Sequence, residues 1–314
     1  MDHSFTPVID IELVDSLLSK MSKGKAAGID KFTCEHIQNS HPIVTSTITK
    51  LFNLMLLHNY VLNDFGRGII IPIPKDKENR RQDKLEDYRG ITISPVLSKL
   101  FEQCLLHFLK DYLINSERQF GFKVGVGCNH AIYAVKKIIE HFSSNSSTVN
   151  ICALDLTKAF DRINHDALFI KLMDRNVPGC IVRLLVNWYS KLNCSVRWGD
   201  AMSNIFKLSQ GVRQGEFFLL FCFAVFVNSI LVKLEKSQLG CFVKQVCYNS
   251  FMYADDLILL SISLTEMQRL IDICVADCKV IGMEINSKKS ACMRIGSRHN
   301  FPVQSLYING KVLS

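Results

Sequence analysis

Apolar residues recur along this chain at two spacings, one typical of helices and one typical of strands. Stretches with a repeat of roughly three to four residues predict amphipathic helices, whereas short runs rich in β-branched residues between turn-forming residues predict strands. Helices are expected at residues 10–22, 41–58, 95–114, 129–142, 165–174, 178–191, 217–235 and 265–281. Strands are expected at residues 67–74, 90–94, 149–154, 193–198, 203–210, 283–285, 291–295 and 305–308.

Two adjacent aspartates, Asp255 and Asp256, lie between apolar segments that read as two further strands. The alternation before the pair and the apolar run after it predict a hairpin with the acids at its tip. Burying two unpaired carboxylates side by side is unfavourable, because desolvation and mutual repulsion both oppose ionisation. A hard divalent cation is therefore expected there. The alternative is a solvated turn between core strands, since aspartate is a common turn residue.

A third carboxylate, Asp155, ends the buried strand that is predicted at residues 149–154. An unpaired acid is unusual at the end of a core strand. Apolar strands that deliver acids at one end suit a Mg²⁺ site, because this ion prefers a few carboxylate oxygens completed by waters and substrate phosphates. A pair of such ions can activate a 3′-hydroxyl and stabilise a leaving pyrophosphate. Strands interleaved with helices in this way predict an α+β fold, in which helices back an antiparallel sheet.

Short motifs surround these acids in a fixed order. Residues 253–256 read Tyr-Ala-Asp-Asp, and residues 154–161 read Leu-Asp-Leu-Thr-Lys-Ala-Phe-Asp. The other segments of the set are residues 24–30, 71–75, 88–92, 119–122, 210–215 and 282–290. With these motifs in this order, the chain resembles the reverse transcriptase domain of non-LTR (LINE-type) retrotransposons. The resemblance implies a right-hand polymerase with fingers and palm, whose antiparallel palm sheet is backed by helices.

The resemblance also implies a division of the chain. Residues 1–19 would be an N-terminal lead-in, and residues 20–148 the fingers with the helices that lead into the palm. Residues 149–296 would be the palm, with residues 165–205 partly fingers and palm helices. Residues 297–314 would begin the connection to a primer grip and thumb, before which the chain is expected to be truncated. No endonuclease is expected ahead of the fingers, and without a thumb the grip on a primer–template duplex should be weak.

The family's catalytic residues match four side chains and one backbone carbonyl of this chain. The resemblance implies Asp155 and Asp255 as the principal ligands of two Mg²⁺ ions, for which Mn²⁺ could substitute. Asp256 matches the family's second acid, which has a less direct role, and the backbone carbonyl of Leu156 is expected as an extra ligand. Lys289 is expected to assist proton transfer to pyrophosphate, although the lysine before it could have that role instead.

Five further residues are expected, on the same resemblance, to bind the nucleotide. Lys75 and Arg89 would contact the triphosphate, and a guanidinium suits bidentate phosphate contact. Phe160 matches an aromatic residue that lies under the sugar and excludes a 2′-hydroxyl, but core packing would equally explain a phenylalanine there. Gln214 and Gly215 would lie beside the nascent base pair.

These features predict an RNA-directed DNA polymerase that adds dNTPs to a DNA 3′-end on an RNA template. After Gly215 the family has another glycine, an aliphatic pair and Ser-Pro, whereas this chain has Glu216, Phe217 and Phe218. Small residues there let the backbone approach the nucleotide, and Glu216 adds bulk and negative charge. The alternative is therefore a catalytically impaired remnant that at most binds nucleic acid. Another palm-like nucleotidyltransferase, such as a cyclase, would explain the acids but not the fingers motifs.

The charge of the chain fits nucleic-acid partners. Lysine and arginine number 37 and aspartate and glutamate 29, for a formal net charge of +8. An excess of this sign suits polyanions such as an RNA template, a DNA primer and dNTPs. No prediction of oligomeric state follows from the sequence.

Cysteine usage and the N-terminus predict an intracellular protein of the cytoplasm or nucleus that is not secreted. The 12 cysteines are scattered through apolar segments without a CxxC pair, which favours reduced core thiols and argues against zinc. The N-terminus lacks the basic-then-apolar form of a signal peptide. The uninterrupted apolar run at residues 217–227 falls well short of the ~20 residues that cross a bilayer, so no membrane partner is expected.

Overall fold

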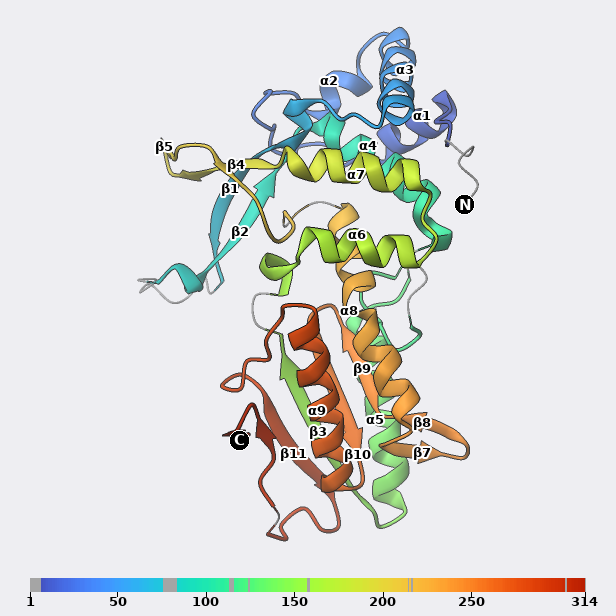
Figure 1. Cartoon of the computed structure of the whole chain (residues 1–314), viewed down its shortest axis with the longest axis vertical. Coiled ribbons are helices and arrows are strands. Elements are labelled where there is room, and N and C mark those ends of the chain that lie inside the picture. Colours follow the sequence, from blue (N-terminus) through green and yellow to red (C-terminus); the bar gives the residue numbers. More distant parts are fainter. Residues whose placement is uncertain are drawn as a thin grey trace. The chain divides into compact units, whose positions relative to one another are not determined.

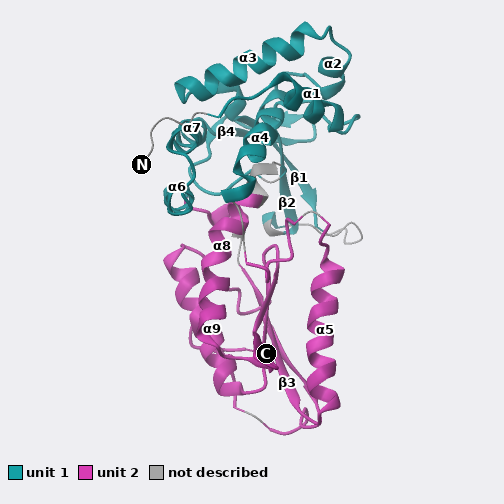
Figure 2. Ribbon diagram, turned by 90° about the vertical axis from the view of Figure 1, so that its right-hand side faces the viewer, with its two compact units in different colours: residues 1–113, 165–220 teal, residues 114–164, 221–314 magenta. Residues whose placement is uncertain are grey.

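The computed structural model describes residues 7–75, 84–112, 116–123, 125–156, 159–213, 215, 217–302 and 304–313. The chain folds as two compact units, each made of two separate stretches of sequence (Figure 2). Unit 1 comprises residues 1–113 and 165–220, and unit 2 comprises residues 114–164 and 221–314. These are packing units, so the assignment of residues to fingers and palm stays a prediction.

Unit 1 contains a sheet in the order β2-β1-β4-β5, with β6 also paired to β4 (Figure 1). The strands of this sheet are β1 (Arg67–Pro74), β2 (Tyr88–Ile93), β4 (Asn193–Trp198), β5 (Ala201–Met202) and β6 (Phe206–Lys207). Strand β1 runs antiparallel to β2 and parallel to β4. The hairpin of β1 and β2 therefore forms one side of the sheet, and β4 brings in the second stretch of sequence.

Two prolines limit how far β4 can pair along β1. The pairing of these strands ends at Ile70, opposite Val196, whereas β1 continues beside β2 as far as Pro74. A proline has no N–H to donate to a ladder, so it is tolerated only where no neighbouring strand needs that donor. Pro72 and Pro74 both lie beyond the last pair with β4. Among the described residues, this end of β1 therefore pairs with β2 alone, and the two strands form a two-stranded ribbon.

An aromatic cluster forms the core of unit 1. The helices of this unit are α1 (Ile11–Lys20), α2 (Cys34–Gln38), α3 (Ile43–His58), α4 (Val96–Leu109), α6 (His165–Asp174) and α7 (Gly179–Ser190). The rings of Phe52 on α3 and Phe101 on α4 have centroids 4.8 Å apart. Trp188 on α7 lies 6.2 Å from the ring of Phe65, and its indole N–H donates to the Phe65 carbonyl oxygen at 3.3 Å. Helices from both stretches of sequence thus share one core.

Unit 2 is built on a four-stranded sheet in the order β11-β3-β10-β9, with every neighbouring pair antiparallel. Its strands are β3 (Thr148–Asp155), β9 (Ser250–Tyr253), β10 (Asp256–Ser261) and β11 (Ala291–Gly296). Helix α5 (Cys128–Ser144) packs on one face, and α8 (Phe217–Ser237) and α9 (Leu264–Val280) lie on the other (Figures 1 and 2). The predicted antiparallel sheet backed by helices is therefore confirmed.

Covering both faces of this sheet explains why β3 is mostly apolar. Successive side chains of a strand point to opposite faces, so a strand covered on both sides favours apolar residues on both. Ile151 packs in a cluster with Val135 and Ile138 of α5. Its neighbour Cys152, which points to the opposite face, is completely buried. Asn150, which interrupts the apolar pattern inside the strand, is buried and donates to the Ser261 carbonyl at 3.0 Å, whereas Asp155 at the end of the strand is only partly buried.

Two short hairpins complete unit 2. They are β7 (Cys241–Val243) with β8 (Val246–Tyr248), and β12 (Tyr307–Ile308) with β13 (Lys311–Val312). The sequence predicts neither β7 nor β8, because these strands are only three residues each.

The predicted strand at residues 203–210 is wrong over most of its length. Only residues 206–207, which form β6, pair with β4. Ser203 instead closes a local turn, because its N–H donates to the Val196 carbonyl at 2.9 Å and its hydroxyl accepts from the Val196 N–H at 2.9 Å.

The strand predicted at residues 283–285 is also absent from this described segment. The N–H of Met283 donates to the Cys278 carbonyl at 2.7 Å, which ties this segment to the end of α9. A single bridge between Ile285 and Leu156 is the remaining strand-like contact. The segment thus contacts α9 at one end and β3 at the other.

Ten of the twelve cysteines are buried and all twelve are free thiols, which agrees with their prediction as core residues. In the part of the chain that the structure describes, no helix combines the length and the apolar character needed to cross a membrane.

Candidate active site

The turn between β9 and β10 presents two of the predicted acids. Tyr253 pairs with Asp256, so the loop that joins the strands consists of Ala254 and Asp255 alone. Ala254 has a φ of +55°, and positive φ at the first central residue alone is the pattern of a type II′ turn. An alanine in this region is strained by about 1–3 kcal/mol, and such strain persists only where neighbouring groups hold it. The predicted hairpin tip is therefore confirmed.

Asp155 and Asp256 are direct partners across β3 and β10. Residues opposite each other in an antiparallel pair have Cβ atoms about 4.5–5.5 Å apart, and like charges there repel. The pKa of Asp256 is accordingly raised above its ordinary value, first by partial desolvation and then by repulsion from Asp255 and from Asp155. Two strands and one turn thus bring all three carboxylates to the same end of the sheet.

The backbone of Asp155 is held by the segment that follows α9. Its N–H donates to the hydroxyl oxygen of Ser290 at 3.1 Å, and its carbonyl accepts from the N–H of Asn286 at 2.8 Å. The next residue, Leu156, makes the bridge to Ile285. Ser290 is only 1% exposed, so water does not replace its hydroxyl as a partner. Residues 285–290 therefore fix where the strand ends.

Lys289, the predicted proton donor, lies in this same segment. Lys288 and Lys289 are both exposed, and the N–H groups of both donate to the side-chain oxygen of Asn286, at 3.1 Å and 3.4 Å. The turn thus holds the two lysines next to the residue that bonds to Asp155. Their exposure and hydrogen bonds therefore do not distinguish Lys288 from Lys289 as the proton donor.

Phe160 packs against a helix. It lies in the short 3₁₀ turn Ala159–Arg162, and its ring centroid is 4.5 Å from that of Phe223 on α8. The rings of Phe223 and Phe122 are in turn arranged edge to face, with their centroids 6.2 Å apart. The side chain of Phe160 is half-buried, so it is a packed residue with one part still open to solvent.

The remaining predicted nucleotide contacts belong to unit 1, whereas the acids, Leu156, Phe160 and Lys289 belong to unit 2. Arg89 on β2 is exposed and pairs with Ile73, and Lys75 follows at the end of β1. Gly215 has a φ of +115°, and a Cβ there would lie 2.9 Å from the carbonyl oxygen of Thr92. Glycine is thus needed at this position for conformational reasons alone. Gln214 and Glu216 lie outside the described residues.

The chemistry of these acids fits a divalent ion. Carboxylate oxygens are the ligands that Mg²⁺ prefers. Desolvation contributes most to the raised pKa of Asp256, and a cation would relieve the further repulsion from Asp255 and Asp155. Among the described residues, however, no group of three or more His, Cys, Asp or Glu side chains is arranged so that it could hold a metal ion. Asp155, Asp255 and Asp256 therefore share one end of the sheet without forming a three-carboxylate metal site in this structure.

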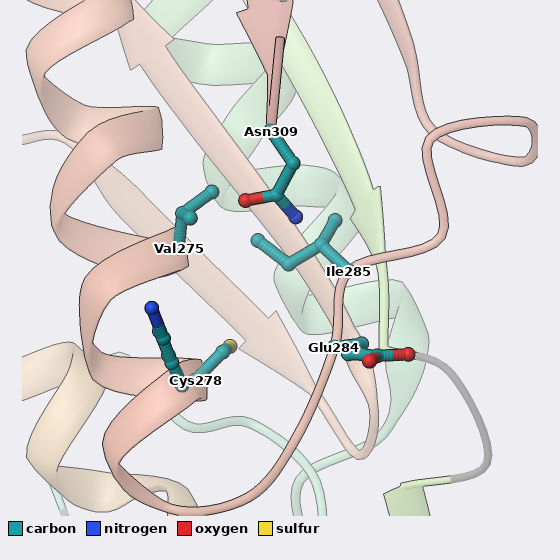
Figure 3. A pocket seen from close by; sticks show the side chains of 6 residues that line it. Val275, Cys278, Glu284, Ile285 and Asn309 are labelled. Carbon is teal, nitrogen blue, oxygen red and sulfur yellow. The ribbon is translucent and has the colours of Figure 1, made fainter. Parts of the chain in front are cut away.

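Unit 2 also has a pocket of about 240 Å³ (Figure 3). It is lined from α9 by Val275, Cys278 and Lys279, and from the other side by Glu284, Ile285 and Asn309. None of the predicted site residues lines it, but its lining residue Ile285 forms the bridge to Leu156. The pocket therefore borders the segment that holds Asp155.

Several residues that shape the site carry no role in the sequence-based prediction. They are Gln119 and Gly121, which contact the Ala254 turn, Asn286 and Ser290, which hold Asp155, and Phe223, which supports Phe160. Gln119, Gly121, Asn286 and Ser290 fall within motifs that the sequence displays, but a motif does not show which neighbour each side chain contacts.

Comparisons with known proteins identify relatives over most of the chain. A family model described as "Reverse transcriptase (RNA-dependent DNA polymerase)" matches residues 73–306. The Pol polyprotein of the type-2 retrotransposable element R2DM of Drosophila melanogaster is 25% identical over 297 residues, which cover 94% of this chain and 27% of that protein. The probable RNA-directed DNA polymerase from transposon X-element of the same species is 28% identical over 255 residues, covering 79% and 28%. The chain thus spans about a quarter of the length of these relatives.

A solved structure shares the fold. The apo telomerase of Candida tropicalis, truncated from its C-terminal domain, aligns with 81% of this chain and 56% of its own at a TM-score of 0.50 and 14% sequence identity. The predicted fold class, a right-hand polymerase with mixed helices and sheets, is thereby confirmed.

Proposed function

Because this chain belongs to the reverse transcriptase (RNA-dependent DNA polymerase) family, with relatives among non-LTR retrotransposons, we propose that it extends a DNA primer on an RNA template. The observation that carries this proposal is the pairing of Asp155 with Asp256 beside the turn that holds Asp255. Three carboxylates at one end of a sheet suit phosphoryl transfer, in which catalysis consists largely of positioning and charge stabilisation.

The carboxylates would hold two Mg²⁺ ions, for which Mn²⁺ could substitute. Asp155 and Asp255 are the proposed principal ligands, with Asp256 in a less direct role and the carbonyl of Leu156 as an extra oxygen. When bound, such ions lower the pKa of a 3′-hydroxyl and neutralise charge on the phosphates. The protein's own contribution is the fixed spacing of the acids, which the β3–β10 register and the bonds from Ser290 and Asn286 supply.

Other residues would orient the nucleotide. Lys75 and Arg89 are proposed to bind the triphosphate, since both are exposed cations at the end of the β1–β2 hairpin. Phe160 would lie under the sugar, and Gln214 with Gly215 beside the nascent base pair. Lys289 would donate a proton to pyrophosphate, because its turn is bonded to the backbone of Asp155 through Asn286.

Primer extension tests this proposal directly. Purified protein is mixed with an RNA template, a DNA primer, dNTPs and either Mg²⁺ or Mn²⁺, and we expect extension that Asp255→Asn abolishes. Asp272→Asn, at an exposed position of α9, is the matched control and should extend normally. Absence of extension by the wild-type chain with both ions would rule out polymerase activity in this chain.

The sequence at Glu216 favours a second candidate, a catalytically impaired domain that still binds nucleic acid. Binding through phosphate contacts alone would weaken steeply as salt rises. In this case Glu216→Gly should restore extension that the wild-type chain lacks. Salt-dependent duplex binding without rescue by Glu216→Gly would count against Glu216 as the cause.

A further inference from the structure

We propose that Gln119 is a positioning residue that holds the Ala254–Asp255 turn in place for catalysis. Its effect on catalysis rests on the proposed polymerase function, whereas its effect on the turn can be measured without any activity. The turn carries Asp255 and is closed by Asp256, so a shift of Ala254 would move both carboxylates.

The segment that carries Gln119 lies along the edge of β9 that faces away from β10. The N–H of Met252 donates to the carbonyl of Arg118 at 2.9 Å, and the N–H of Phe120 donates to the carbonyl of Met252 at 2.8 Å. Gln119 and Met252 therefore form a parallel bridge. Strand β9 is thus held on both sides, by β10 and by this segment.

Arg118 anchors the segment to the rest of unit 2. Its guanidinium donates to the side-chain oxygen of Asn249 and to the carbonyl of Cys247, and it forms an ion pair with Glu235 of α8 at 3.2 Å. The Arg118 side chain is only 13% exposed, so this network is largely shielded from water. These contacts of Arg118 therefore fix the backbone position of the neighbouring residue, Gln119.

The side chain of Gln119 reaches the strained turn. It is 1% exposed, its amide N–H₂ donates to the Ala254 carbonyl at 3.5 Å, and its amide oxygen accepts from the Gly121 N–H at 2.9 Å. Both ends of this buried amide thus have partners, as buried polar groups require. One partner belongs to its own segment and the other to the turn, so the side chain ties the two together.

Gly121 allows the close approach that this contact needs. A Cβ at position 121 would lie 2.5 Å from the backbone nitrogen of Ala254 and 3.1 Å from the Gln119 amide oxygen. The glycine backbone therefore lies directly against the turn. Gln119 and Gly121 together hold Ala254 at its positive φ, which an unsupported alanine rarely adopts.

Hydrogen exchange of the turn tests this proposal. The variant is Gln119→Met, which fills similar space but makes no hydrogen bond. The matched control is Asn150→Ala, because the buried Asn150 amide donates to the Ser261 carbonyl at 3.0 Å at the other end of the β3–β10 pair. We expect Gln119→Met to speed amide exchange in a peptide of residues 251–257 about tenfold, and Asn150→Ala to leave that peptide unchanged.

A double variant adds a second readout. Glycine adopts positive φ without strain, so in an Ala254→Gly background Gln119→Met should speed exchange of the same peptide much less. In primer extension, Gln119→Met should lower kcat about tenfold and leave the KM for dNTP unchanged.

Wild-type exchange in Gln119→Met would overturn the proposal, as would an equal rise in the Asn150→Ala control. If the chain has no polymerase activity, the exchange result still decides the role of Gln119 in the turn. If Gln119→Met does not fold, Gln119→Asn decides the same question, because its amide is one methylene too short to reach Ala254.

Discussion

Asp155 and Asp256 face each other across β3 and β10, in a register that places two like charges at the same end of one sheet. Folding therefore brings together groups that repel each other unless a cation is bound. The raised pKa of Asp256 records this conflict, in the order partial desolvation, Asp255 and Asp155. Without a metal ion, the folded protein with an ionised Asp256 is therefore less stable than it would be with a neutral residue at this position. This difference can be measured.

Asp256→Asn should stabilise the metal-free protein at neutral pH. A raised carboxyl pKa in the folded state means that stability falls as pH rises from the unfolded-state pKa of about 3.9 through the folded-state value. The variant escapes this loss, so at pH 7 it should gain up to about 1 kcal/mol, a limit set by solvent screening of the exposed side chain. Urea unfolding in EDTA at pH 7 and near pH 3.5 measures the gain, which should vanish at the lower pH. Asp200→Asn, in an exposed turn, should show neither effect.

Ser290→Ala should weaken the hold on Asp155. The substitution removes the acceptor of the Asp155 N–H at a position that is almost fully buried, and an unsatisfied buried donor costs about 1–3 kcal/mol. We expect the free energy of unfolding to fall by this amount and the kcat of primer extension to fall with it. Ser261→Ala removes a comparably buried hydroxyl at the far end of β10 and serves as the control. An equal loss of kcat in both variants would contradict a specific role for Ser290.

Phe223→Leu should loosen discrimination against ribonucleotides. The ring of Phe223 lies 4.5 Å from that of Phe160, so a smaller side chain would let the proposed sugar contact shift. Competition between dNTP and rNTP in primer extension should show about a tenfold rise in rNTP incorporation, which corresponds to about 1.4 kcal/mol. The control is Val225→Ala, a buried substitution on the same helix. Unchanged discrimination in folded Phe223→Leu would show that Phe160 keeps its position without this support.

Lys288→Met and Lys289→Met should separate the two lysines, whose exposure and hydrogen bonds to Asn286 are alike. If Lys289 donates the proton, its replacement should lower kcat by about 10²-fold, within the usual range for general acids, and remove the upper limb of the pH–rate profile. Lys288→Met should then extend primers normally. The reverse pattern would assign the proton transfer to Lys288.

The sequence predicts the carboxylate end of the palm-like sheet well, because the signals there are local. The apolar run of β3 ends at Asp155, and the alternation around Ala254 and Asp255 indicates a turn within a few residues. Period-two and apolar patterns depend only on neighbours along the chain, so they can be recognised in the sequence without knowledge of the fold. The same holds for the long helices α3, α5 and α9.

The supports of the site could not be predicted, because they depend on contacts between distant segments. Gln119 reaches Ala254 across 135 positions, and Asp155 meets the Ser290 hydroxyl across another 135. Nothing in the immediate neighbourhood of either side chain specifies that partner. The strand predicted at residues 283–285 failed for the same reason, since α9 captures the N–H of Met283.

The prolines of β1 have a consequence for self-association. Since a proline nitrogen cannot donate, Pro72 and Pro74 occupy positions whose nitrogens point away from β2, toward the side that β4 leaves open beyond Ile70. An open strand edge is a template on which a second chain can add a strand and start aggregation. Without donors at these two positions, the outer edge of the ribbon cannot complete such a ladder. Within the described residues, the β1 side of the ribbon next to Lys75 is thereby protected from edge-to-edge pairing.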